Sequence, residues 1–200
     1  FLAPLPGEQV LDACAAPGGK STHLAQLMAN SGRITACDVE AKKLRFIAES
    51  SARLGISIVE TMTLDASQPR QTLGERRFDR ILVDAPCSGL GVIRRNPEGK
   101  WWKSVYDVAR LAALQKTILT GLAASLNKGG TLLYSTCSTT QAENEAVIDD
   151  FLSQHPDFVV EDLRILFPEY TELFTERGFF RSWPHRHGMD GFFAARLRKN

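Results

Sequence analysis

Short apolar segments alternate with amphipathic ones along most of this chain, and that alternation restricts its possible folds more than any other feature. The apolar segments predict strands at Val10–Ala13, Arg33–Asp38, Ile56–Leu64, Phe78–Asp84 and Thr131–Ser135. Apolar residues at helical spacing predict helices at Gly19–Asn30, Ala41–Leu54, Val105–Leu126 and Gln141–His155. Repeated strand–helix units fold into parallel sheets with right-handed crossovers. We therefore expect an α/β, Rossmann-like, doubly wound sheet of about seven strands.

The last part of the chain departs from this alternation. The Gly-rich stretch Asn127–Gly130 predicts the C-cap of the preceding helix. The final strands, which are expected to form an antiparallel edge, lie near Phe158–Asp162, Phe179–Ser182 and Gly191–Arg198. The 200 residues, 44% of them hydrophobic, suit a single domain over 1–200. Because the chain begins with Phe1 rather than Met, we expect it to be a fragment or one domain of a longer protein.

Composition limits the partners and the compartment. The formal net charge is +1, so a nucleic-acid surface would be a local patch rather than a property of the whole chain. Four cysteines are widely spaced, and no histidine stands at metal-ligand spacing, so we expect no metal site, no disulfide and a reducing cytoplasm. No signal peptide is visible and no apolar run approaches the roughly 20 residues that span a bilayer, which predicts a soluble protein. Cys14 and Cys37 are interpreted as small residues buried at strand ends.

The segment Asp12–Lys20 joins the first predicted strand to the first helix and has the form of a nucleotide-binding loop. It lacks the first glycine of a phosphate-binding loop, because Cys14 stands at that position, and it does not match the dinucleotide pattern of spaced glycines. Pro17 also removes a backbone donor that a pyrophosphate would use. What remains is a turn at Gly18 and Gly19 that lets the backbone approach a ligand closely.

Carboxylates follow several predicted strands at the same sheet edge. Asp38 ends the second strand, where it can accept hydrogen bonds from ribose hydroxyls, and Asp65 follows the third, near the expected place of an adenine. Asp84 ends the fourth strand. Such a set suits a positively charged ligand better than a pyrophosphate. S-adenosylmethionine, a sulfonium that carries an adenosyl group and an amino acid, is therefore the expected cofactor.

Two cysteines stand in the turns beyond the fourth and fifth predicted strands, Cys87 in Asp84–Ser88 and Cys137 in Tyr134–Ser138. Open α/β folds bind ligands at this edge, so both thiols are expected beside the cofactor. Cytosine C5 is a weak nucleophile, and its methylation requires a thiolate to add to C6. One thiol can attack, the other can assist release, and Asp84 can hydrogen-bond the pyrimidine edge. The residues alone leave open which thiol attacks, since Pro86-Cys87 is similar to the Pro-Cys pair of DNA cytosine-C5 methyltransferases.

Three motifs together resemble the signatures of the Nop/Sun RNA cytosine-C5 methyltransferases: Asp12–Lys20, Asp84–Gly89 and Tyr134–Ser138. The similarity covers nearly the whole chain, including its ending Asp190–Phe193. It implies a class I S-adenosylmethionine-dependent methyltransferase fold in which Cys137 is the nucleophile, Cys87 assists product release and Asp84 contacts the cytosine. It also implies that the cofactor is held by Cys14, Ala15, Ala16, Pro17, Gly18, Gly19, Lys20, Asp38, Lys43, Asp65 and Asp84.

Within this family, the loop Gly91–Pro97 with Lys100 and Trp101 is most similar to the Sun branch, the 16S ribosomal RNA methyltransferase B group. The resemblance implies ribosomal RNA as the substrate; the alternatives are transfer RNA or another ribosomal site, or a non-catalytic RNA-binding or assembly module. We expect the family's separate N-terminal RNA-binding region to lie outside this chain. RNA contacts are predicted from a loop that interleaves cations with an aromatic ring, at Arg94, Arg95, Lys100 and Trp101. A second basic patch is predicted at Arg181, His185, Arg186 and His187.

Overall fold

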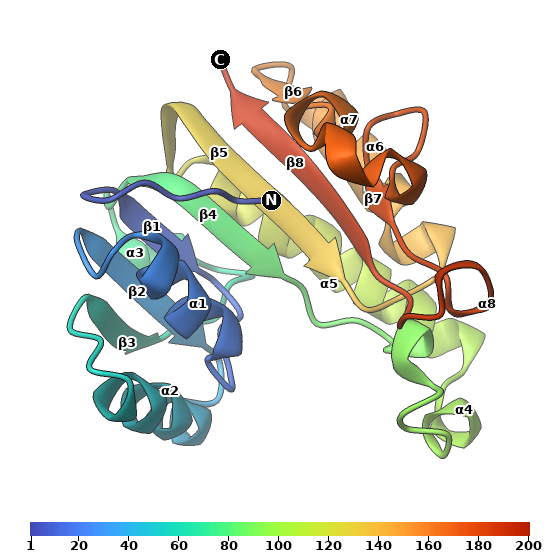
Figure 1. Cartoon of the computed structure of the whole chain (residues 1–200), viewed down its shortest axis with the longest axis horizontal. Helices are drawn as coiled ribbons and strands as arrows, with labels where there is room; N and C mark the ends of the chain where they lie inside the picture. The colour runs from blue at the N-terminus through green and yellow to red at the C-terminus, as the bar shows by residue number, and fades with distance from the viewer.

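An eight-stranded mixed sheet forms the centre of the computed structural model, which describes residues 1–200 apart from the side chain of Trp102 (Figure 1). The strands are β1 Gln9–Asp12, β2 Arg33–Asp38, β3 Val59–Thr63, β4 Phe78–Asp84, β5 Leu126–Thr136, β6 Phe158–Val160, β7 Phe180–Arg181 and β8 Phe193–Lys199. Their order is β3-β2-β1-β4-β5-β8-β6, and β7 also pairs with β8. The first five strands are parallel. The eighth runs antiparallel to β5, β6 and β7, so the predicted Rossmann-like sheet with an antiparallel C-terminal edge is confirmed.

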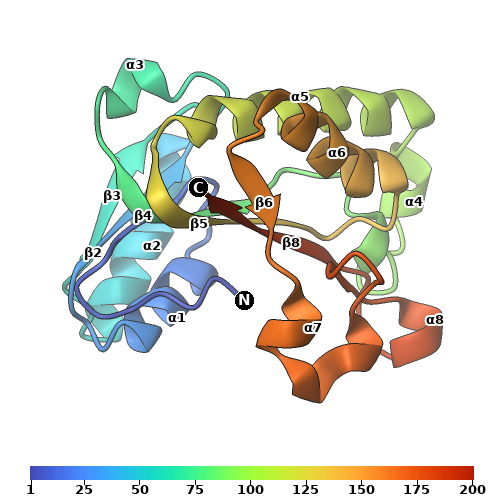
Figure 2. The ribbon, with the colours of Figure 1, turned by 90° about the horizontal axis from the view of Figure 1, so that it is seen from above.

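Helices cover both faces of this sheet. They are α1 Gly19–Leu27, α2 Ala41–Arg53, α3 Arg70–Leu73, α4 Gly99–Trp102, α5 Val105–Ala123, α6 Glu145–Gln154, α7 Leu163–Leu166 and α8 Pro184–His187. Short 3-10 turns occur at Leu90–Val92, Gln141–Glu143 and Pro168–Leu173. Seen from above, α5 and α6 lie on one side of the sheet, and α1 and α2 lie on the other (Figure 2). Among the described residues, no helix has the length and apolar character needed to cross a membrane.

Successive side chains of the central strands point to opposite faces of the sheet, and each face packs against its own hydrophobic core. In β4 and β5, Val83 and Leu132 face the core that α5 completes with Leu119. Their neighbours Leu82 and Leu133 face the opposite core, which α1 fills with residues such as Leu24. Because both faces of these strands are buried, the strands read as continuous apolar runs. The packing fixes where each strand ends, and therefore where the polar residues that follow it are placed.

Two helix ends differ from the prediction. The first helix stops at Leu27 because Ala29 and Asn30 adopt positive φ angles of 50° and 54°, which no helix continues. The long helix α5 ends at Ala123, and Asn127–Gly130 belongs to β5 rather than to a helix cap. Gly130 is glycine for a different reason: a Cβ atom there would lie 2.9 Å from the Asp79 carbonyl oxygen of the neighbouring strand.

The segment after β5 and the end of the chain also depart from the prediction. The helix expected over Gln141–His155 is divided into the 3-10 turn Gln141–Glu143 and helix α6, which begins at Glu145. Helix α8 lies between β7 and β8, where no helix was predicted. Strand β8 pairs with β5 on one side and with β6 and β7 on the other, so the predicted antiparallel edge ends with β6.

Candidate active site

The carboxyl ends of β1, β2 and β4 border a cavity of about 370 Å³. Its lining includes the predicted cofactor residues Cys14, Ala16, Asp38, Lys43, Asp65 and Asp84. A smaller cavity of about 270 Å³ shares Cys14, Ala16 and Asp84 with it and adds Ala15, Pro17, Gly19 and Lys20. Residues from separate motifs therefore surround one region of the sheet edge, as the sequence predicted.

The loop after β1 is shaped by one glycine and one carboxylate. Gly18 has a φ of +108°, and a Cβ atom there would approach Ile47 to 3.0 Å, so the loop needs glycine at this position. Gly18 packs on helix α2, whereas its neighbours line the cavities. Asp38 accepts hydrogen bonds from the Ala16 amide at 3.3 Å and from the Glu40 amide at 3.0 Å. Its carboxylate thus ties the loop to the end of β2 while it lines the larger cavity.

Two other predicted cofactor residues have local partners. The Lys43 ammonium pairs with Glu40, and that hydrogen bond raises the pKa of Lys43. Asp65 accepts hydrogen bonds from the Ser67 hydroxyl at 2.6 Å and the Ser67 amide at 2.9 Å, which lower the pKa of the Asp65 carboxyl. Both side chains line the larger cavity in their charged forms.

Asp84 lies where the cavities meet. Lys20 Nζ is 2.6 Å from Asp84 Oδ2, and Ser135 Oγ donates to Asp84 Oδ1 at 2.9 Å. A further cavity of about 260 Å³ adjoins these three residues and continues between apolar side chains, among them Phe192. Beneath the loop, Asp12 is fully buried and accepts a hydrogen bond from Ser21 Oγ at 2.7 Å. Burial raises the pKa of Asp12 to about 7.

The two predicted thiols meet at this edge. Cys87 Sγ lies 3.2 Å from Cys137 Sγ, and both residues are partly accessible. The hydrogen bond from the Cys87 thiol lowers the pKa of Cys137 against the opposing effect of burial. The same hydrogen bond and burial raise the pKa of Cys87. The pair therefore favours a thiolate on Cys137 and a thiol on Cys87.

The other two cysteines lie outside this pair. Cys37 is fully buried in β2, and burial raises its pKa to about 12. It packs in the core, as predicted. Cys14 is only partly buried, because it lines the larger cavity, and desolvation raises its pKa as well.

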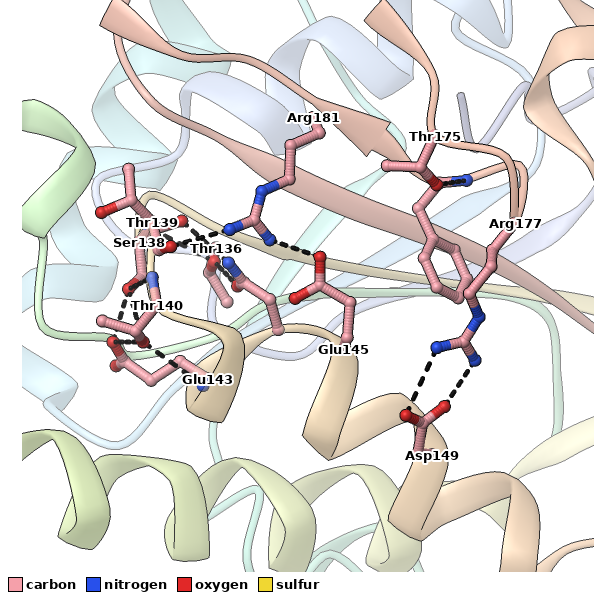
Figure 3. A network of polar contacts seen from close by, with 12 residues as sticks. Thr136, Ser138, Thr139, Thr140, Glu143, Glu145, Asp149, Thr175, Arg177 and Arg181 are labelled. Atoms are coloured by element: carbon pink, nitrogen blue, oxygen red, sulfur yellow. Dashed lines mark hydrogen bonds and ion pairs between the residues drawn. The ribbon is translucent and has the colours of Figure 1, made fainter.

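Glu143 is a site residue that the sequence reasoning missed. It follows the second thiol loop and is fully buried, and its carboxylate accepts hydrogen bonds from the Ser88 amide at 2.7 Å and from Ser88 Oγ at 2.6 Å. It also accepts from Ser138 Oγ at 2.5 Å and Thr140 Oγ1 at 3.0 Å (Figure 3). The pattern Thr140-x-x-Glu143 indicates a helix start. The structure agrees, since Thr140 caps the 3-10 turn Gln141–Glu143. Nothing local points to Ser88, which lies 55 residues earlier.

A chain of backbone contacts joins the second thiol loop to the C-terminal segment. The Gly91 amide donates to the Cys137 carbonyl at 2.9 Å, and the Gly191 amide donates to the Gly91 carbonyl at 2.8 Å. A Cβ atom on Gly91 would lie 1.9 Å from the Gly191 carbonyl oxygen, so this approach requires glycine. The predicted motif Asp190–Phe193 therefore includes a residue, Gly191, that is bonded to the segment next to Cys137.

The predicted RNA-contacting residues divide into two groups. Arg94 and Arg95 both pair with the buried carboxylate of Asp190, at 2.5 and 2.6 Å, and Arg94 also donates to the Gly188 carbonyl. Arg94 therefore anchors the loop to the C-terminal segment. By contrast, the Trp101 side chain is 77% exposed, with the Lys100 ammonium 4.7 Å from its ring centroid.

In the second predicted basic patch, too, an arginine is occupied by partners within the protein. Arg181 is buried, donates to Glu145 at 2.6 Å and to the Thr139 carbonyl at 2.7 Å, and lies over the Trp183 ring. Figure 3 shows it pointing at the second thiol loop rather than outward. His187 Nδ1 accepts from the Trp183 amide. Among the described residues there is no group of three or more His, Cys, Asp and Glu side chains that could hold a metal ion.

The sheet order and the cofactor-type loop after β1 define the class I S-adenosylmethionine-dependent methyltransferase fold. Its likeness to distant structures is one of fold: TrmN from Thermus thermophilus shares 19% identity at a TM-score of 0.67, with 100% of this chain and 46% of that chain covered. The model of the family described as 16S rRNA methyltransferase RsmB/F matches residues 1–198. The chain belongs to this family.

Several relatives are much more similar. The probable ribosomal RNA small subunit methyltransferase B of Bacillus subtilis is 48% identical over 199 residues, which cover 99% of this chain and 44% of that protein. The structure of NSun6 from Pyrococcus horikoshii, solved with SFG, shares 33% identity at a TM-score of 0.84 and covers 99% of this chain and 49% of that one. A methyltransferase homologue from the same organism shares 36% identity at a TM-score of 0.83, covering 100% and 64%. The chain spans less than half the length of the curated relatives that it matches.

Proposed function

We propose that this chain is the catalytic domain of a cytoplasmic enzyme that transfers a methyl group from S-adenosylmethionine to C5 of a cytidine in RNA. The observation that carries the proposal is the contact between Cys87 and Cys137, 3.2 Å apart. Asp84 and Pro86, which lie just before Cys87 in the chain, line a ligand-sized cavity. Cytosine-C5 methylation uses one thiolate and gains from a second proton-carrying group nearby. The expected roles of Cys137 and Cys87 agree with the directions in which their pKa values are shifted.

The larger cavity suits S-adenosylmethionine. Its volume is within the range of small-molecule sites, and the carboxylates of Asp38, Asp65 and Asp84 complement a cationic ligand. Asp38 is assigned to the ribose, Asp65 to the adenine end, and the loop Cys14–Lys20 to the amino acid end, with Lys43 at the cavity rim. SFG, which was bound in the NSun6 structure, is an S-adenosylmethionine analogue. The bound cofactor supplies an electrophilic methyl group.

The chain's own residues supply the nucleophile, the orientation of the cytosine and the assistance to release. The Cys137 thiolate would add to C6, which forms a C–S bond and moves the C5–C6 electron pair to C5. This pair would then bond to the methyl carbon, while the bond from the methyl carbon to the sulfonium sulfur breaks and its electrons stay on that sulfur. Asp84, oriented by Lys20 and Ser135, hydrogen-bonds the pyrimidine edge and stabilises the adduct. Loss of the C5 proton to a base restores the C5–C6 double bond and expels the Cys137 thiolate, and Cys87 assists this release. The aromatic cavity beside Asp84 offers space for a flipped-out base.

The proposed RNA face lies on the loop before helix α4, on α4 itself and on the first turn of helix α5. Its exposed Trp101 and Tyr106, 77% and 87% accessible, can stack on unpaired bases, and Lys100 can contact phosphates. Arg95 pairs with Asp190, but its side chain is 69% exposed and can reach a phosphate as well. Arg94 is assigned to holding the loop rather than to RNA, because its guanidinium is occupied. The names of the relatives favour 16S ribosomal RNA as the substrate over transfer RNA. We retain the expectation that a separate N-terminal region contributes to RNA binding.

The test uses the full-length protein, S-adenosylmethionine and small-subunit RNA from a strain that lacks the gene. We expect 5-methylcytidine at one position by bisulfite mapping and nucleoside mass spectrometry, none with Cys137→Ser, and a covalent protein–RNA band on a denaturing gel with Cys87→Ala. Methylation of transfer RNA alone would replace the substrate assignment. Calorimetry that detects no S-adenosylmethionine binding would favour the non-catalytic alternative.

A further inference from the structure

One buried carboxylate joins the two residues that directly follow the two thiols. Glu143 accepts from the amide and the hydroxyl of Ser88, next to Cys87, and from the hydroxyl of Ser138, next to Cys137. The two serine hydroxyls lie 3.2 Å apart, the same separation as the two sulfur atoms. The thiol loops therefore run side by side and are bridged one residue beyond the reactive groups.

The electrostatics of this bridge indicate a role other than stability. Glu143 is fully buried, and among the described side chains no cation pairs with it. Burial alone would raise the pKa of its carboxyl, but hydrogen bonds from Ser138, Ser88 and Thr140 outweigh burial and lower it. A buried carboxylate is costly unless its oxygens are satisfied, and an apolar or amide side chain of similar size would avoid that cost. Here the negative charge of Glu143 is stabilised by hydrogen-bond donors from the two thiol loops that this residue joins.

The bridge acts on the thiols through the backbone. The Ser88 amide belongs to the peptide unit that follows Cys87, so its bond to Glu143 fixes the orientation of the Cys87 backbone. On the other side, Gln115 Nε2 donates to Glu143 at 3.2 Å and to the Pro86 carbonyl at 2.9 Å, which anchors the same loop to helix α5. The Cys137 loop is held by Ser138 and Thr140. Both loops thus take their position from one carboxylate.

We infer that Glu143 is a positioning residue that holds the two thiols at contact distance, so that attack and release can occur on the same base. The role of this spacing in catalysis rests on the proposed function. The sulfur–sulfur distance itself is a property of the structure and does not depend on that function. A displacement of about 1 Å between reacting groups can lower a rate by about 100-fold. Loss of the bridge should therefore affect thiol–thiol chemistry as well as methyl transfer.

The substitution Glu143→Gln keeps the side-chain shape but replaces one acceptor oxygen with an NH2 group that opposes the serine donors. The matched control is Glu8→Gln, which removes another largely buried bridge, from Glu8 to Arg80 at 2.6 Å, at the opposite edge of the sheet. The readout without RNA is the rate at which diamide joins Cys87 to Cys137. Diamide takes up two electrons and two protons as the S–S bond forms, and peptide mapping identifies the bond.

We expect Glu143→Gln to slow this cross-linking by about tenfold and methyl transfer by about 100-fold, with an unchanged dissociation constant for S-adenosylmethionine. Glu8→Gln should lower the thermal midpoint without slowing cross-linking. Should Glu143→Gln unfold the protein, Ser88→Ala and Ser138→Ala, which each remove fewer bonds, should each slow cross-linking instead. Cross-linking at the wild-type rate in the folded variants would overturn the inference. Slower cross-linking in a protein whose wild type methylates no RNA would support it and reject only the proposed function.

Discussion

The sulfur atoms of Cys87 and Cys137 lie 3.2 Å apart, and their contact shifts the pKa values of the two thiols in opposite directions. The hydrogen bond from Cys87 favours the thiolate on Cys137, and it raises the pKa of Cys87 itself. The residues alone left open which of the two attacks, and the family resemblance implied Cys137. This asymmetry favours Cys137 as the nucleophile and leaves Cys87 with a proton to use at a later step.

Replacement of Cys87 by alanine should raise the pKa of Cys137, because the thiolate loses its hydrogen-bond donor. The pH profile of Cys137 alkylation by iodoacetamide, followed by peptide mass spectrometry, should move to higher pH. At neutral pH the alkylation should therefore be slower than in the wild type. The control is Cys37→Ala, which changes a buried thiol in the core. A profile for Cys87→Ala that matches the wild type would contradict the assigned direction of the hydrogen bond.

Removal of the Asp38 carboxylate should weaken S-adenosylmethionine binding by about tenfold or more, because a hydrogen bond to a charged group contributes about 1.5–3 kcal/mol. Asp38→Ala also loses the bond to the Ala16 amide, which shapes the cofactor loop. Asp79→Ala is the matched control, since Asp79 accepts from the Gln9 amide and from Asn127 at the opposite edge of the sheet. Calorimetry on both variants checks the prediction, and equal affinities would exclude Asp38 from the cofactor site.

A methyl group on Gly91 should disrupt the catalytic edge. Gly91→Ala would place its Cβ atom 1.9 Å from the Gly191 carbonyl oxygen, so the two segments must separate. We expect a loss of about 3 kcal/mol or more in the free energy of unfolding, at the upper end for overpacking, together with loss of methyl transfer. Denaturant unfolding measures this effect. Gly99→Ala, whose Cβ atom meets nothing within 4 Å, should leave stability nearly unchanged.

Asp12 should make the protein less stable as pH rises. Burial raises the pKa of its carboxyl from the ordinary value of 3.8 to about 7, so the folded state binds the proton more tightly than the unfolded state does. The stabilisation is complete below about pH 4 and is lost as pH rises through about 7, with a total on the order of 4 kcal/mol. In Asp12→Asn, thermal midpoints measured from pH 4.5 to 8 should fall less than in the wild type. A parallel pH dependence in both proteins would show that Asp12 does not carry the effect.

The sequence allowed the sheet and the meeting of the two thiols to be predicted because both depend on local patterns. Strands β2 and β4 match their predicted bounds, Arg33–Asp38 and Phe78–Asp84, since apolar runs followed by polar turns mark strand ends. Once β4 and β5 were expected to end at one edge, Cys87 and Cys137 had to lie near each other. Their contact at 3.2 Å is a finding of the structure.

What the sequence could not provide depends on partners far along the chain. Arg94 was interpreted as an RNA contact because its acceptor, Asp190, lies 96 residues later. Glu143 reads as an ordinary helix-start residue until Ser88 is placed beside it. The glycines of Asn127–Gly130 indicated a helix end, whereas Gly130 serves close packing against β4. In each case the role of the residue depends on a tertiary contact with a segment that is distant in the sequence.

Strand β8 separates β5 from β6 in the sheet although it follows both in the chain. A polypeptide leaves the ribosome N-terminus first, so β5 keeps an open edge and β6 has no strand to join until residues 193–199 have been synthesised. Gly191, which is bonded to Gly91, arrives at the same late stage. Nascent chains that stop short of this strand therefore lack both the strand that joins β5 to β6 and the Gly191–Gly91 contact beside the thiol loops.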